Sequence, residues 1–120
     1  MPVSYKVGDK DTRPWGTWEV VAAGAQYIVK RICVLPDKLL SLQLHHHRAE
    51  HWVVVDGAGR ITLGDRTFEA PQNTPVYIPA GVKHRMANAT DKPMTFIEIQ
   101  TGETLDEADI VRFEDSYGRV

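Results

Sequence analysis

The sequence predicts an all-β domain of short strands arranged as a β-sandwich or barrel. Short runs rich in Val, Ile, Tyr and Thr recur along the chain, and Gly, Pro, Asn and Asp separate them at close spacing. Helical periodicity is scarce. The length of 120 residues is that of one domain.

Each expected strand is a run of β-favouring residues between turn residues. The runs cover residues 27–35, 39–47, 50–55, 60–63, 67–70, 75–78, 83–88 and 94–100. Asp56-Gly57 and Gly64-Asp65 predict hairpin turns. Pro79-Ala80-Gly81 predicts a tight turn before the next strand.

The two ends of the chain differ from this middle part. Residues 1–25 are aromatic and irregular, which predicts an arm that wraps over the sandwich or a partner subunit. Thr104-Leu105-Asp106-Glu107 has the spacing of a capping box, and apolar residues follow it, so we expect a short C-terminal helix. The single domain 1–120 then divides into an arm (1–25), a β core (26–102) and a C-terminal segment (103–120).

Composition and charge exclude several classes of protein. With 14 Lys+Arg against 16 Asp+Glu, the net charge of −2 argues against a nucleic-acid or anionic-membrane partner. The apolar runs are too short to span a bilayer, and residues 1–18 lack the apolar region of a signal peptide. Cys33, the only cysteine, excludes an internal disulfide and is expected in the core. We therefore expect a cytoplasmic protein.

Four of the five histidines fall within seven residues, and the fifth is distant; they are His45, His46, His47, His51 and His84. If residues 39–47 form one strand, alternation places Gln43, His45 and His47 on one face and His46 on the other. The first face then carries several metal-ligand donors. The alternative is a solvated, histidine-rich strand.

Two spaced motifs resemble those of the cupin superfamily, whose fold is a double-stranded β-helix or jelly roll. The first has Gln43-x-His45, then Glu50 and Gly57, and the second has Pro79-x-Gly81-x-x-His84-x-x-x-Asn88. The resemblance implies one divalent metal bound by Gln43, His45, Glu50 and His84, with Gln43 in the slot where a histidine is usual. These ligand types suit zinc, our first choice, and also Mn, Fe, Ni or Co. A rival ligand set is His45, His47, His51 and His84.

The stretch from Gln43 to Val55, QLHHHRAEHWVVV, resembles the signature of type II phosphomannose isomerases. These are cupin domains that occur alone or at the C-terminus of bifunctional mannose-1-phosphate guanylyltransferases. Further matching segments are residues 13–19, 77–81, 84–85, 97–102, 109–112 and 117–119. The chain departs from the cupin pattern at Asp37, where glycine is usual, and from the family pattern at Ala87, Thr104, Asp106 and Ala108. The metal motifs are intact, so the departures concern the substrate more than the metal.

The resemblance implies a metal-dependent isomerase that interconverts mannose 6-phosphate and fructose 6-phosphate through an enediol, in nucleotide-sugar and polysaccharide biosynthesis. His47 is our first candidate for the base because it shares the predicted face of His45, although it could equally support a ligand; His51 is the second. The candidate substrate contacts are Arg48, Arg85 and Arg112 for the phosphate and Glu98 and Gln100 for sugar hydroxyls.

Two other functions stay open at this point: a non-catalytic cupin that binds a metal and a sugar, and a metal-dependent dioxygenase. The sequence has no Gly-rich nucleotide loop, so a separate guanylyltransferase is a candidate partner. Leu40, Leu42 and Leu44 need cover on the face opposite the ligands, which predicts a homodimer. We expect Trp52 and Tyr77 in the core, and Trp15 and Trp18 in packing contacts.

Overall fold

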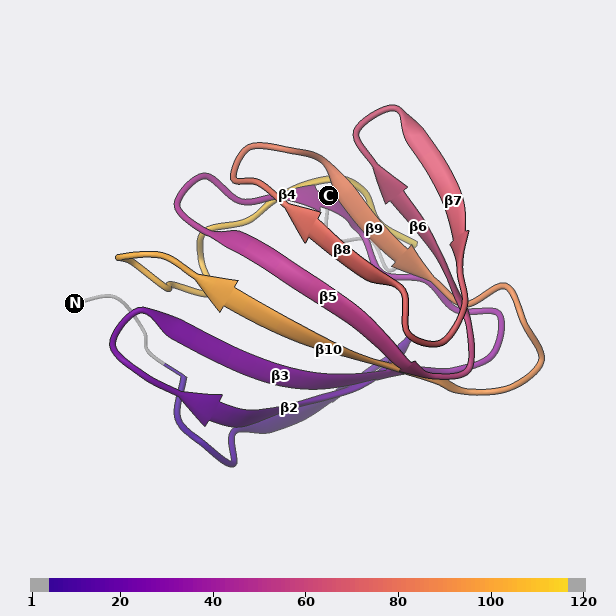
Figure 1. The fold of residues 1–120 in the computed structure, drawn as a ribbon, viewed down its shortest axis with the longest axis horizontal. Helices are drawn as coiled ribbons and strands as arrows, with labels where there is room; N and C mark the ends of the chain where they lie inside the picture. Colours follow the sequence, from indigo (N-terminus) through magenta and orange to yellow (C-terminus); the bar gives the residue numbers. More distant parts are fainter. Residues whose placement is uncertain (1–4, 117–120) are drawn as a thin grey trace.

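A computed structural model describes residues 5–116 and shows two antiparallel β-sheets packed against each other (Figure 1). The all-β prediction is confirmed, because these residues form strands and no helix. The strands are β1 (Lys10–Arg13), β2 (Gly16–Ala23), β3 (Tyr27–Val34), β4 (Leu42–Leu44), β5 (Ala49–Asp56), β6 (Gly59–Leu63), β7 (Arg66–Ala70), β8 (Pro75–Ile78), β9 (His84–Ala87), β10 (Met94–Thr101) and β11 (Val111–Glu114).

The larger sheet has six strands in the order β1-β2-β3-β10-β5-β8, and the smaller has five in the order β11-β4-β9-β6-β7. Strand β10 lies in the middle of the larger sheet and pairs with β3 and β5 over most of its length. The chain passes repeatedly between the sheets, as Figure 1 shows for β8 and β9. Residues distant in sequence therefore meet in the space between the layers.

The interior is apolar toward one end of β10 and polar toward the other. Met94, Phe96, Glu98 and Gln100 are the buried residues of this strand, and they alternate with half-buried ones. The first two belong to the hydrophobic core, which also contains Trp15, Val34, Trp52, Val54, Ile61, Ala70, Ile78 and Met86. The change from apolar to polar residues along one inward face marks where a site can form.

The predicted turns are confirmed with one exception. Gly64-Asp65 joins the antiparallel strands β6 and β7, and residues 79–81 turn the chain from β8 toward β9. Asp56-Gly57 is not a hairpin turn, because it carries the chain from β5 in the larger sheet to β6 in the smaller one. Asp37 has a φ of 59°, a left-handed conformation that favours glycine, which explains the glycine usual at this motif position.

The expected N-terminal arm contains two strands of the larger sheet. Strand β2 pairs with β3 from Gly16 opposite Val34 to Ala23 opposite Ile28, with an irregularity between Val20 and Ala22. The boundary at residue 25 therefore does not separate an irregular arm from the sheet. Trp15 is buried in the core and Trp18 packs against it, in line with the packing role expected for both.

The predicted C-terminal helix is wrong. In residues 103–110, which we call the strap, the Asp106 carboxylate accepts a hydrogen bond from the Ala108 amide, and the Asp106 carbonyl accepts one from the Asp109 amide. These local bonds form turns in place of helical ones. Strand β11 follows and pairs with β4. The sequence match at residues 117–119 lies outside the described residues.

Three placements also differ from the sequence predictions. The strand expected over 39–47 is reduced to β4 and an isolated bridge at Leu39, because the chain bends after Leu44. Cys33 is only half-buried, since it alternates with the inward residues of β3. Tyr77 is 53% exposed, because β8 buries its two neighbours instead. Residues 5–116 contain no helix that could cross a membrane.

Candidate metal centre

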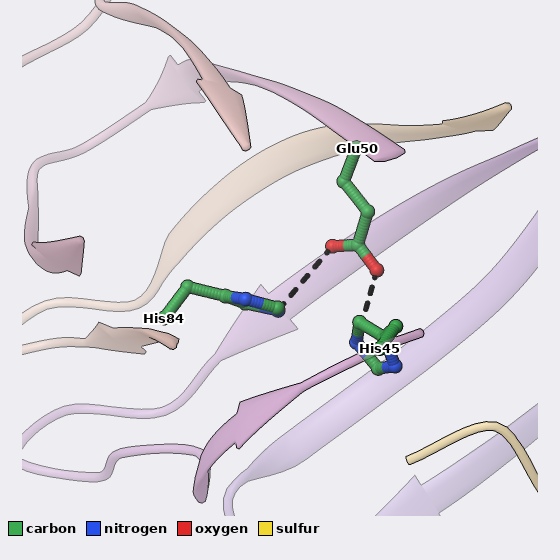
Figure 2. Close-up of side chains that lie close together, drawn as sticks. All are labelled: His45, Glu50 and His84. Atoms are coloured by element: carbon green, nitrogen blue, oxygen red, sulfur yellow. Dashed lines mark ion pairs between the residues drawn. The ribbon is translucent and has the colours of Figure 1, made fainter. Parts of the chain in front are cut away.

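Three metal-ligating side chains from separate parts of the chain meet between the sheets. His45 follows β4, Glu50 lies on β5 and His84 begins β9; each side chain is buried. One donor atom from each lies within 4.8 Å of the others. The Glu50 carboxylate lies between the two imidazoles (Figure 2), 3.2 Å from Nε2 of His45 and 3.7 Å from Nε2 of His84.

Backbone geometry explains why these side chains point inward. On β5, Glu50, Trp52 and Val54 are the buried residues and alternate with more exposed ones. On β9, His84 and Met86 are buried in the same way. His45 lies beyond the end of β4, and its carbonyl accepts a 2.7 Å hydrogen bond from the Gly81 amide. The turn that precedes His84 therefore also holds the backbone of His45.

Hydrogen bonds fix which nitrogen of each imidazole carries the proton. Nδ1 of His45 lies 2.6 Å from the carbonyl oxygen of Asp109, and Nδ1 of His84 lies 2.9 Å from that of Val82. A carbonyl only accepts, so each Nδ1 donates and each Nε2 keeps its lone pair. Nε2 of His84 is buried without a hydrogen-bond partner among the described residues. An unpaired buried acceptor beside a carboxylate is what a metal ligand requires, so these residues fit a divalent metal.

Burial keeps both imidazoles neutral. Burial, together with the smaller effect of the nearby Arg48 guanidinium, lowers the pKa of His45 to about 3. Burial also lowers the pKa of His84. Neutral imidazole is the form that binds metals, so protons do not compete for these atoms near neutral pH.

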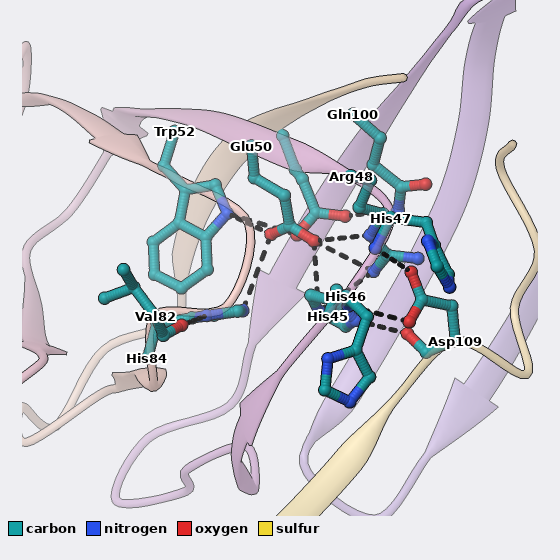
Figure 3. A network of polar contacts seen from close by, with 11 residues as sticks. His45, His46, His47, Arg48, Glu50, Trp52, Val82, His84, Gln100 and Asp109 are labelled. Atoms are coloured by element: carbon teal, nitrogen blue, oxygen red, sulfur yellow. Dashed lines mark hydrogen bonds and ion pairs between the residues drawn. The ribbon is translucent and has the colours of Figure 1, made fainter. Parts of the chain in front are cut away.

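Glu50 is held by side chains on both sides (Figure 3). Arg48 donates to Oε2 from Nε at 2.9 Å and from Nη2 at 2.8 Å, and its Nη2 also lies 3.1 Å from Nε2 of His45. The indole N–H of Trp52 donates to Oε1 of Glu50 at 2.9 Å and to Glu98 at 3.2 Å. The carboxylate is therefore fixed in orientation, as expected of a preorganised ligand.

Two more polar residues extend this network along β10. Gln100 donates from its amide nitrogen to Glu98 at 2.8 Å, and its amide oxygen is buried without a hydrogen-bond partner among the described residues. Burial raises the pKa of Glu98, and the neighbouring Glu50 carboxylate raises it further. Both side chains are buried on the inward face of β10.

A cavity of about 500 Å³ reaches the candidate metal centre at His45, the one of the three candidate ligands that lines it. Gln43 lines it together with His45, and the β4–β9 register pairs Gln43 with His84. Directly paired residues share one face of a sheet, so Gln43 lies on the same face as His84. The side chains around the cavity are those of Tyr5, Arg13, Trp15, Trp18, Lys30, Ile32, Leu40, Ser41, Gln43, His45, Arg48, Glu98, Asp106, Glu107, Ala108, Ile110 and Arg112.

The structure brings most of the predicted substrate residues to this region. Arg48, Glu98 and Arg112 line the cavity, and Gln100 is buried beside Glu98. Arg85 is an exception, because it alternates with the buried residues of β9. Its guanidinium donates to the Leu40 carbonyl at 3.0 Å and pairs with Glu114 at 3.5 Å, so its contacts hold strand ends together.

The two histidines predicted as bases lie elsewhere. Because β4 ends at Leu44, the expected alternation does not extend to His47, which is exposed, as is His46. His51 is exposed on β5, with its ring 4.8 Å from that of Tyr77. The inward position of His47 and the rival ligand set that needs His47 and His51 are therefore wrong.

The sequence reasoning missed Lys30, Arg13 and Tyr5, which line the cavity. Lys30 could have been found, because it alternates on β3 with the inward-facing Ile28 and Ile32. Arg13 begins residues 13–19, the first of the segments that resemble the family. Tyr5 precedes the first strand, and no sequence motif or alternation indicated that it lines a site.

Comparison with known families identifies the chain's relatives. The family model described as mannose-6-phosphate isomerase C-terminal matches residues 3–115. Xanthan biosynthesis protein XanB of Xanthomonas campestris pv. campestris (strain B100) is 51% identical over 107 residues, which are 89% of this chain and 23% of that protein. Mannose-1-phosphate guanylyltransferase ManC of Salmonella typhimurium is 49% identical over 108 residues, 90% of this chain and 22% of that protein. The chain thus spans about a quarter of the length of these relatives.

Solved structures match the fold at low sequence identity. Oxalate decarboxylase of Lactobacillus farciminis superposes with a TM-score of 0.75 at 16% identity, covering 88% of this chain and 33% of that one. The Cnp3 cupin domain of Schizosaccharomyces pombe gives 0.68 at 9% identity, covering 72% and 64%. The cupin fold expected from the two motifs is confirmed.

Proposed function

The chain belongs to the family of mannose-6-phosphate isomerase C-terminal domains, and on that premise we propose that it isomerises mannose 6-phosphate and fructose 6-phosphate with a bound divalent metal. The observation that carries this proposal is the buried group of His45, Glu50 and His84 at the edge of a cavity lined by basic residues. An anionic sugar needs such cations, and an isomerase needs an acid–base group beside them.

We assign Gln43, His45, Glu50 and His84 as the residues that would hold the metal, with zinc as the first choice. The neutral Nε2 atoms and the fixed carboxylate support this assignment. When bound, the metal supplies Lewis-acid polarisation of the sugar carbonyl and stabilises the developing oxyanion.

We assign the proton transfer to Glu98 in place of His47. Its carboxylate is buried, lines the cavity and is oriented by Trp52 and Gln100. Starting from the open-chain aldose, the carboxylate takes the proton from C2 while O1 gains a proton, which gives the enediol. The carboxylic acid then returns its proton to C1 while the O2 hydroxyl loses one, which gives the ketose and restores the carboxylate.

A coupled assay for fructose 6-phosphate tests this function. The protein is stripped of metal with a chelator and then supplied with Zn²⁺, Mn²⁺, Fe²⁺, Ni²⁺ or Co²⁺ one at a time. Glu98→Gln should lower kcat at least a hundredfold, whereas the exposed His47→Ala should retain wild-type turnover. Absence of turnover with all five metals would contradict the proposed function.

A second candidate is a non-catalytic protein that binds a metal and a sugar. Asp106 and Ala108, two of the positions that depart from the family pattern, lie in the cavity wall, so the substrate side of the site is altered. Binding of mannose 6-phosphate without turnover would support this candidate. A guanylyltransferase, the activity that names the relative ManC, is the partner we propose for this site in nucleotide-sugar synthesis.

We also propose that the protein forms a homodimer. Leu40 packs against the core of its own chain. It therefore does not need to be covered by a partner subunit, which was the reason for predicting a dimer from the sequence. Support comes instead from β5 and β8 of the larger sheet, where Val55 and Tyr77 are 38% and 53% exposed. Sedimentation at micromolar concentration tests this, and a monomer alone would contradict it.

A further inference from the structure

Lys30 is a buried cation inside the proposed active site. It lies on β3, and only 8% of its surface is exposed. Its neighbours in register are Glu98 on β10 and Val20 on β2. Burial of an ammonium group is costly unless charge or hydrogen bonds compensate for it, so a lysine at this position calls for a physical reason.

Two aromatic rings hold the ammonium group. Nζ of Lys30 lies 4.0 Å from the ring centroid of Tyr5 and 4.4 Å from that of Trp18. The two rings meet nearly edge to face, at 5.6 Å and 80°. Cation–π contacts stabilise a positive charge, and they leave the N–H donors available for an acceptor.

Three other basic residues near the centre have partners of their own. Arg48 binds Glu50 and His45, Arg85 binds the Leu40 carbonyl and Glu114, and Arg13 pairs with Asp11 at 2.7 Å. Lys30 is held by ring faces, and it lines the cavity together with Glu98. Its charge is thus placed toward the space that a substrate would occupy.

We propose that Lys30 binds the phosphate group of the substrate and so determines specificity for phosphorylated sugars. This inference rests on the proposed function. A phosphate oxygen accepts charge-assisted hydrogen bonds from an ammonium group, and the aromatic rings limit where that group can move. Burial lowers the pKa of Lys30, whereas Glu98 opposes this shift. A bound phosphate, like Glu98, would favour the charged ammonium form of Lys30.

The test compares binding of mannose 6-phosphate, inorganic phosphate and mannose by calorimetry, together with kcat and KM. Lys30→Met keeps most of the unbranched side chain without its charge, and Lys30→Arg keeps the charge. We expect Lys30→Met to weaken binding of both phosphate compounds at least tenfold. Lys30→Arg should lose less, and binding of mannose should be unchanged. Metal content and far-UV circular dichroism verify that each variant is folded.

Lys83→Met is the matched control. Lys83 also lies over an aromatic ring, with Nζ 4.1 Å from the Phe113 centroid, but it does not line the cavity. The control should bind phosphate compounds like the wild type. If folded Lys30→Met binds them as tightly as the wild type, or if the wild type binds neither, the inference is overturned. If the wild type binds mannose 6-phosphate through Lys30 without isomerising it, the inference stands and the proposed function fails.

Discussion

Nδ1 of His45 lies 2.6 Å from the backbone carbonyl oxygen of Asp109, a residue 64 positions further along the chain. The Asp109 carboxylate also accepts 2.8 Å hydrogen bonds from the backbone amides of His46 and His47. One residue of the strap thus orients a metal-ligand candidate and holds the bend that follows β4. The strap connects the wall of the cavity with the metal centre.

Asp109→Ala should weaken metal binding. Loss of the carboxylate frees the bend at 45–48 and lets the carbonyl move away from His45, which loosens the imidazole. Loss of an outer partner of a metal ligand costs about 10- to 100-fold in affinity. Competition with a chromogenic chelator measures this, with Asp91→Ala, an exposed residue that does not line the cavity, as the control. Equal affinities of the two variants would show that the strap does not position His45.

The candidate ligands can be separated from the neighbouring histidines by substitution. His84→Ala should lower metal occupancy, because it removes a buried Nε2, whereas His46→Ala should not, because that side chain is exposed. Elemental analysis of the purified proteins measures the occupancy.

Thermal unfolding provides a second readout of the same pair. Bound metal stabilises the folded state by mass action, so a chelator should lower the Tm of the wild type and of His46→Ala. The Tm of His84→Ala should respond little to the chelator. Equal metal losses in both variants would contradict the assignment of His84.

Most strands could be predicted because they alternate locally. The inward placement of Glu98 and Gln100 on β10 follows from this alternation alone. The histidine cluster was less predictable, since the break after Leu44 depends on contacts with Asp109 and Gly81 that no local pattern shows. The predicted helix failed because Asp106 bonds to nearby amides, and β11 then pairs with β4. Long-range contacts, which a local pattern does not contain, decided the first case, whereas local side-chain bonds and the long-range pairing of β11 with β4 acted together in the second.

The metal-free protein should lose stability in acid. Burial lowers the pKa of His45 from 6.5 to about 3 and also lowers that of His84. As the pH falls below about 6.5, the unfolded chain binds protons that the folded chain does not, so the free energy of unfolding decreases. Each such proton contributes a limiting slope of about 1.4 kcal/mol per pH unit. Urea unfolding in the presence of a chelator, between pH 7.5 and 5, measures the slope.

A pair of variants isolates the contribution of the buried histidines. His84→Gln should reduce the slope, whereas the exposed His47→Ala should leave it unchanged. Burial and Glu50 raise the pKa of Glu98, which contributes a slope of the opposite sign in every variant. The difference between variants therefore reports on the histidine alone, and identical slopes would rule out a buried neutral His84.

The indole of Trp52 should stabilise the centre through its N–H group. It donates to Glu50 at 2.9 Å and to Glu98 at 3.2 Å, so Trp52→Phe leaves two buried carboxylates with one donor fewer. We expect the free energy of unfolding to fall by about 1–3 kcal/mol from the lost hydrogen bonds, with a further loss from packing. Metal affinity should fall as well, because Glu50 is less well oriented.

Trp15→Phe provides the comparison. Trp15 is also buried in the hydrophobic core, with 5% of its surface exposed. Unlike Trp52, it donates no hydrogen bond to a carboxylate among the described residues. This variant should lose stability by packing alone and keep its metal affinity. Urea unfolding and chelator competition on both variants separate the two effects. If both lose metal affinity to the same extent, packing of the core, rather than the indole N–H, orients Glu50.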